Sequence, residues 1–137
     1  TPPNERGGMA SAGYNGNKEA GTRAEEYVAR QTGGERTPNA WFDVDTPEGI
    51  AEVKSTQERL SSGRRGRFRL WYDQHQNLKD HGGTYWFLVE GHEPQQLDPE
   101  EVDEIMDEKG LSWASAGEHP QGTDQLKLTW TYVLDDE

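Results

Sequence analysis

Three residues near the middle of the chain have the types and spacing needed to hold a metal ion beside a phosphate. Asp43 precedes the turn Thr46-Pro47-Glu48-Gly49, and Glu52 and Lys54 follow it. Pro at the second turn position and Gly at the fourth suit a type I turn joining two antiparallel strands. The predicted register pairs residue 45 with 50, 44 with 51 and 43 with 52. Asp43 and Glu52 are then cross-strand neighbours with their β-carbons about 5 Å apart, and Lys54 lies on the same face.

This arrangement predicts a metal site. Two facing carboxylates repel, and a hard divalent cation removes that penalty, because magnesium prefers oxygen ligands and commonly binds one or two carboxylates, waters and a phosphate. Lys54 would supply a cation that orients the attacking water or stabilises charge at phosphorus. The competing interpretation of Glu-x-Lys on a strand is a solvated charge pair. Asp43 across the turn favours the metal site, since Phe42, Val44, Ala51 and Val53 form a clean apolar reverse face.

The elements expected to position these residues alternate between helix and strand. Apolar periodicity and the Gly, Pro and Asp signals predict helices over 19–32, 70–81 and 98–109, and strands over 40–45, 50–56, 84–90 and 126–134. Residues 57–69 and 110–123 are predicted to be loops. The order α-β-β-α-β-α-β indicates an α/β fold, with a mixed central sheet flanked by helices.

Five of the nine arginines lie within eleven residues of the predicted 57–69 loop: Arg59, Arg64, Arg65, Arg67 and Arg69. The guanidinium fork matches phosphate oxygens, and the intervening Ser and Gly residues let the backbone follow a groove. We interpret the loop as a DNA clamp. The alternative is a solvated loop that balances surface acidity.

Two residues of the predicted 70–81 helix are secondary candidates for contact with nucleic acid. Gln74 falls in the apolar stripe and needs a polar partner, such as a site water or a phosphate. His75 lies one predicted helical turn from Trp71, and the pair could contact DNA. A glutamine satisfied by backbone and an ordinary surface histidine are the competing interpretations.

The motifs Gly21-Thr-Arg-Ala-Glu25, Trp41-Phe-Asp43 and Ala51-Glu52-Val-Lys54-Ser-Thr56, followed by a helix and a strand, resemble the PD-(D/E)XK nucleases. Within that superfamily the pattern most resembles the archaeal Holliday junction resolvases, over about residues 18–90. Phe42 stands where the motif has proline. The resemblance implies a restriction-endonuclease-like core and a homodimer that cuts DNA, of branched or junction type, with Mg²⁺. Mn²⁺ is expected to substitute.

The resemblance also assigns roles to individual residues. Asp43 and Glu52 would be metal ligands, Lys54 the catalytic lysine, and Glu25 a helix carboxylate that reaches the metal, with the backbone carbonyl of Val53 as a further ligand. Glu25 is favoured over Glu26 because it lies at the border of the buried helical stripe. Arg23 and Ser55, which lie within the matching motifs, are expected to contact nucleic acid.

Composition bounds the remaining expectations. The 137 residues fit one domain, and five Trp, five Tyr and three Phe supply core area despite a mean hydropathy of -1.12. We expect a flexible leader over 1–17 and a single nuclease domain over 18–137, with its core at 18–90 and an acidic C-terminal extension at 91–137. No cysteine is present, which excludes disulfides, and no apolar run has membrane-span length, so we expect a cytoplasmic protein without a membrane partner.

The net charge of -12 is unevenly distributed. Residues 90–137 hold 14 Asp or Glu and two Lys, whereas acids and bases balance over residues 1–89. Many acids and few lysines are typical of halophilic proteins, which work where salt screens distant repulsion from DNA. Three alternatives stay open at this point: a restriction- or repair-type nuclease on duplex DNA, a non-catalytic DNA-binding module, and a nucleic-acid-mimic inhibitor. The arginine cluster argues against the mimic.

Overall fold

A computed structural model describes residues 18–37, 41–117 and 123–134, so the predicted leader over 1–17 lies outside the described residues. The elements along the chain are α2 (Lys18–Thr32), β2 (Glu35–Arg36), β3 (Val44–Thr46), β4 (Gly49–Thr56), β5 (Arg67–Trp71), α3 (Tyr72–His81), β6 (Thr84–Val89), β7 (Gln95–Leu97), α4 (Pro99–Lys109), β8 (Gln125–Thr129) and α5 (Trp130–Val133).

The main sheet has five strands in the order β2-β3-β4-β6-β7. Its centre is the parallel pair β4–β6, and the other pairs are antiparallel, which confirms the predicted mixed α/β architecture. The hairpin register is also confirmed, because Val44 lies opposite Ala51 and Asp45 opposite Ile50. Strands β2 and β7 were not predicted. A separate two-stranded sheet pairs β5 with β8.

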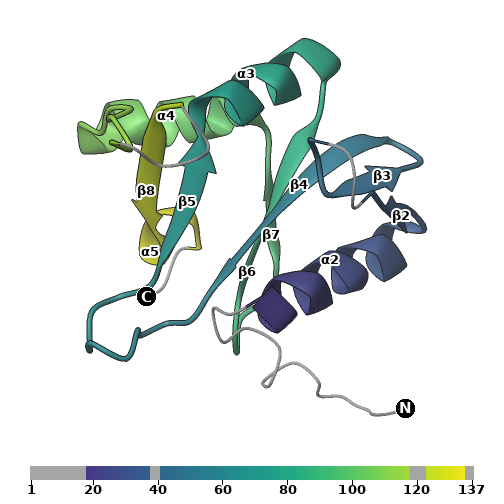
Figure 1. Cartoon of the computed structure of the whole chain (residues 1–137), viewed down its shortest axis with the longest axis horizontal. Helices are drawn as coiled ribbons and strands as arrows, with labels where there is room; N and C mark the ends of the chain where they lie inside the picture. The colour runs from purple at the N-terminus through teal and green to yellow at the C-terminus, as the bar shows by residue number, and fades with distance from the viewer. Residues whose placement is uncertain (1–17, 38–40, 118–122, 135–137) are drawn as a thin grey trace.

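The two faces of the main sheet carry separate cores. Figure 1 shows α2 on one side of the main sheet and α3, α4 and the β5–β8 pair on the other. On one face α2 packs Ala24 and Val28 against β3 and β4, whose contributions are Val44, Ala51 and Val53. The larger core lies on the other face, between the sheet, α3, α4 and the β5–β8 pair; its largest members include Phe68, Leu70, Leu78, Tyr85 and Phe87. Strand β4 is therefore covered on both sides, which explains how polar residues on it become buried.

The structure corrects the prediction for residues 67–71. They form β5 rather than the end of a loop and the start of a helix, and α3 begins only at Tyr72. Phe68 and Leu70 are buried while Arg67 and Arg69 are exposed, which is the period of a strand with one face in the core. The partner strand β8 lies more than fifty residues further along the chain, so local periodicity could not reveal the pairing.

The C-terminal third is built into these layers. Helix α4 was predicted correctly: the backbone N–H of Asp98 donates to Glu101 Oε1 (2.8 Å), the reciprocal half of a capping box. The predicted strand over 126–134 is confirmed only up to Thr129, where β8 ends, and the chain continues as the short helix α5 with a buried Trp130. No helix in the described ranges is long and apolar enough to cross a membrane.

Candidate active site

Asp43 is fixed immediately before β3 by the partner strand. Its backbone N–H donates to the carbonyl of Ala51 (3.1 Å), and its side-chain Oδ2 accepts from the backbone N–H of Val53 (2.8 Å). The hairpin register thus holds this carboxylate against β4 at the level of Glu52, as predicted. One carboxylate oxygen is occupied by the backbone, which orients the side chain without neutralising it.

Glu52 and Lys54 form the centre of the site. Glu52 is only 3% exposed, and its Oε2 lies 3.1 Å from Lys54 Nζ. Its other oxygen, Oε1, is the single buried side-chain polar atom without a hydrogen-bond partner among the described residues. Lys54 Nζ also donates to Gln74 Oε1 (3.4 Å), and Gln74 Nε2 donates to the carbonyl of Trp41 (3.4 Å). Gln74 therefore has polar partners within the protein, one of them a backbone carbonyl as in the competing interpretation, and its contact with nucleic acid stays a prediction.

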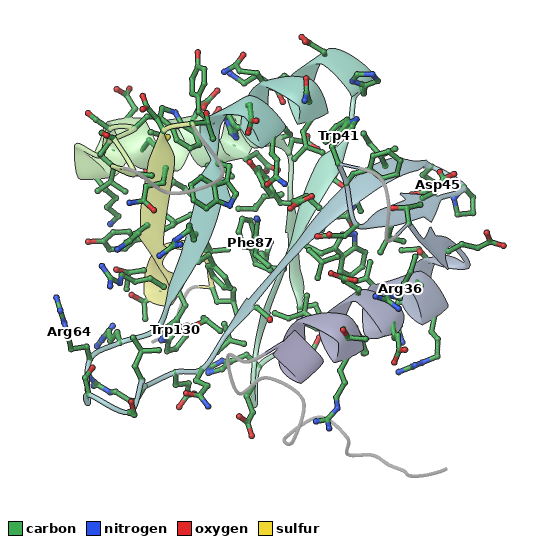
Figure 2. The ribbon with its side chains drawn as sticks, in the orientation of Figure 1. Arg36, Trp41, Asp45, Arg64, Phe87 and Trp130 are labelled. Atoms are coloured by element: carbon green, nitrogen blue, oxygen red, sulfur yellow. The ribbon has the colours of Figure 1, made fainter. Side chains whose placement is uncertain are left out.

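Glu25 reaches the same place from α2. Its Oε1 accepts two hydrogen bonds from Arg36, at 3.1 Å from Nε and 3.0 Å from Nη2, while its neighbour Glu26 is exposed. Arg36 was missed in the sequence because it lies on the two-residue strand β2, too short to give a periodic signal; Figure 2 shows it over α2. We call Glu25, Asp43 and Glu52 the acid cluster.

Burial raises the pKa of all three carboxyl groups, and the charge of Asp43 adds to the rise at Glu25 and Glu52. Burial raises the pKa of Glu52 to about 7, with Lys54 opposing the rise and Asp43 adding to it. Burial also raises the pKa of Asp43, against the hydrogen bond from Val53, and the pKa of Glu25, to which the charge of Asp43 contributes. The acid cluster is therefore a place where negative charge is costly unless a cation is supplied.

The donor set fits a hard divalent cation. Within the described ranges, no three His, Asp or Glu side chains are already arranged to hold a metal ion. Arg36, the Val53 amide and Lys54 each contact one carboxylate oxygen of the acid cluster. Glu52 Oε1, however, is a buried oxygen without a hydrogen-bond partner. Such an oxygen can serve as a ligand of a divalent cation.

The comparison with protein families agrees with this geometry. The model of a PD-(D/E)XK nuclease superfamily domain matches residues 11–135. The chain belongs to the PD-(D/E)XK nuclease superfamily. Members of this superfamily are typically nucleases and generally use divalent metal ions such as Mg²⁺. No curated protein and no solved structure matches the chain significantly.

In this PD-(D/E)XK domain the arginine-rich segment is a narrow hairpin between β4 and β5. Arg59 and Arg65 form an isolated bridge, and the backbone N–H groups of Leu60 and Gly63 donate to the carbonyls of Arg64 and Leu60 (2.8 Å each). Figure 2 shows Arg64 at the far end of this hairpin, on the side of the molecule opposite Arg36. The structure therefore does not bring these arginines into the acid cluster.

Some of the remaining candidate residues stay untested, and one prediction is wrong. Arg23 is exposed on α2, and Ser55 is half-buried beside Lys54, so the contact of each with nucleic acid stays a prediction.

The prediction that His75 contacts DNA together with Trp71 is wrong. His75 is fully buried, with Nδ1 2.8 Å from Tyr85 Oη and Nε2 2.9 Å from Asp103 Oδ1, and Trp71 belongs to β5 rather than to the helix. Both ring nitrogens are occupied within the protein.

Proposed function

We propose that this PD-(D/E)XK domain is a magnesium-dependent DNA endonuclease that acts on branched DNA in the manner of a junction resolvase. One observation carries the proposal: a buried carboxylate, Glu52, has an unpartnered oxygen beside a second acid, Asp43, and a half-buried lysine, Lys54. A purely structural role would leave this oxygen unsatisfied at a cost of about 1–3 kcal/mol.

The acid cluster supplies the ligands. Asp43 and Glu52 would hold the ion directly, the carbonyl of Val53 would add an oxygen from the same strand, and Glu25 would complete the set, directly or through water. Both hydrogen bonds from Arg36 end on Glu25 Oε1, so Oε2 is the oxygen available for that task. When bound, Mg²⁺ would offset the charge of the phosphate and increase the acidity of a coordinated water.

Contacts within the site position the ammonium group of Lys54, which we propose binds the substrate phosphate. Its ammonium group lies between Glu52 Oε2 and Gln74 Oε1, and the Trp41 carbonyl fixes Gln74 in turn. In the hydrolysis that we propose, a water oxygen bonds to phosphorus and the water loses a proton to solvent, one ester P–O bond breaks, and the departing oxygen takes up a proton. Lys54 donates hydrogen bonds to the phosphate oxygens as their charge increases.

Selectivity for junctions and a homodimeric state are the finer parts of the proposal. They are supported by the likeness of the motifs around Glu25, Asp43 and Glu52 to those of the archaeal resolvases. A two-fold dimer would place two sites on the symmetric arms of a four-way junction. A restriction- or repair-type nuclease would use the same acid cluster on duplex DNA, and only the choice of substrate separates the two.

A substrate panel tests the proposal. Four-way, flap, nicked and plain duplex DNA are incubated with Mg²⁺ or with chelator, using wild-type protein and Lys54→Ala. We expect magnesium-dependent cutting of the four-way junction in preference to duplex, and a loss of roughly 10²–10³-fold in Lys54→Ala at unchanged DNA affinity. Equal cutting of plain duplex would reject the resolvase assignment, and full activity in Lys54→Ala would reject the catalytic site.

A further inference from the structure

The outer face of β5 carries a regular row of cations. Arg65, Arg67 and Arg69 are exposed, while the residues between and beyond them, Gly66, Phe68 and Leu70, are buried. Strand geometry spaces alternate residues by roughly 6.5–7 Å, so Arg67 and Arg69 leave the outer face of β5 about one such interval apart, and Arg65 precedes them at the end of the hairpin. The pattern is that of a strand with one face in the core and a cationic face exposed.

The neighbouring strand β8 extends this row instead of neutralising it. Thr129, Lys127 and Gln125 lie opposite Arg67, Arg69 and Trp71, and none of the three is acidic. Lys127 is one of only two basic residues in the C-terminal 48, which hold 14 acids. Like charges directly opposite each other destabilise a strand pair, so the Arg69–Lys127 pair gains nothing for the fold. Within the described residues, no salt bridge involves Arg67, Arg69 or Lys127.

The same cations line a small surface pocket together with Leu60 and Phe68: Arg67, Arg69 and Lys127. An aromatic ring lies next to it along β5, because the guanidinium of Arg69 sits 5.5 Å from the centroid of the Trp71 ring. A pocket with three cations fits a phosphate group, and an adjacent indole fits a base. A cationic pocket beside an indole ring suits a nucleotide, with its phosphate and base, better than a simple anion.

We propose that the cationic strip formed by Arg67, Arg69 and Lys127, with Trp71 at its end, binds single-stranded DNA. A phosphate would occupy the pocket at Arg69 and Lys127, and an unpaired base would stack near Trp71. Bases inside a duplex are already stacked on one another, so an aromatic side chain contributes to affinity mainly where the strand is unpaired. The inference rests on the proposed nuclease function and narrows its substrate to branched DNA with an unpaired strand.

Binding of a fluorescein-labelled oligo-dT of about 20 nucleotides, followed by anisotropy in chelator over a series of salt concentrations that begins at low ionic strength, tests this inference without requiring cleavage. Lys127→Gln and the double variant Arg69→Gln/Lys127→Gln remove the pocket charges. We expect the double variant to bind at least tenfold more weakly, and the slope of log affinity against log salt to fall by about 0.7 per lost contact. Trp71→Leu should weaken binding roughly tenfold with the salt slope unchanged. Arg30→Gln, an exposed arginine on α2, is the matched control and should bind as wild type.

A 20-base-pair duplex measured in parallel decides between kinds of nucleic acid. If Arg69→Gln/Lys127→Gln loses affinity for the single strand but not for the duplex, the inference is supported. An equal or larger loss on duplex overturns the assignment to single strands, and wild-type affinity in Arg69→Gln/Lys127→Gln overturns the site. Thermal melting checks that each variant folds, and Lys127→Gln, whose side chain is exposed, provides the readout if the double variant does not. Because Mg²⁺ is absent, these outcomes are independent of Lys54 and leave the catalytic proposal to its own test.

Discussion

The acid cluster and the cationic strip both crowd like charges, but they do so at opposite degrees of burial. Glu52 is 3% exposed and Asp43 is half-buried against β4, whereas Arg67, Arg69 and Lys127 are all exposed on the β5–β8 pair. Buried like charges cannot be screened by water and salt, so they demand protons or a bound cation. Exposed ones are screened and cost little.

This difference separates chemistry from affinity within one small domain. The acid cluster is positioned by the main sheet and α2, which share a core, and the cationic strip by a two-stranded sheet whose inner face packs on the other core. Variants on one side should therefore change the catalytic rate or the stability, and variants on the other side should change the dissociation constant. The predictions below test that division.

The largest expected effect outside catalysis is on stability in Glu52→Gln. Because burial raises the folded-state pKa of Glu52 from 4.5 to about 7, this group favours folding below pH 4.5, and that contribution is lost as pH rises through about 7. In chelator at pH 8, Glu52→Gln should be more stable than wild type by on the order of 1–3 kcal/mol, allowing for the lost partner of Lys54, and nearly equal at pH 4. Urea unfolding across pH measures the difference.

Glu48→Gln is the matched control for this prediction, since Glu48 is exposed in the hairpin turn. It should parallel wild type at every pH. If the stability difference between Glu52→Gln and wild type is constant from pH 4 to pH 8, then Glu52 does not titrate as a buried, uncompensated acid, and the contrast between the two regions is lost.

A smaller effect is expected at the tip of the arginine hairpin. Arg64→Gln/Arg65→Gln removes two exposed cations, and we expect about tenfold weaker binding to duplex and junction DNA, with a salt slope lower by about 1.8. Anisotropy titrations in chelator measure both quantities, and the cleavage rate at saturating DNA should stay near that of wild type. A fall in that rate without a change in affinity would place these arginines in the chemistry instead.

Sequence reasoning succeeded where the determinants are local. The turn at 46–49 sets its own register, so the placement of Asp43 against β4 followed from a few adjacent residues, and Asp98 and Glu101 marked the start of α4 in the same way. These signals do not depend on the rest of the fold.

Sequence reasoning failed where contacts with a segment distant in the sequence determine the local structure. Leu70 and Trp71 fit a helical stripe as well as a strand, and only pairing with β8 selects the strand. Helix α3 therefore starts only at Tyr72. His75 is buried because of tertiary packing, and Tyr85 and Asp103, from two other elements, contact its ring nitrogens. Arg36 lies on a strand that exists only because β3 is beside it.

Manganese binding, followed by the loss of the free Mn²⁺ resonance in electron paramagnetic resonance, tests the central claim most directly. Wild-type protein should bind the ion and release it to excess Mg²⁺. Asp43→Asn keeps an acceptor for the Val53 amide but removes the charge, so it should bind at least tenfold more weakly. Asp45→Asn, an exposed acid two residues away, should match wild type. Equal affinity in Asp43→Asn and wild type would contradict a metal site in the acid cluster.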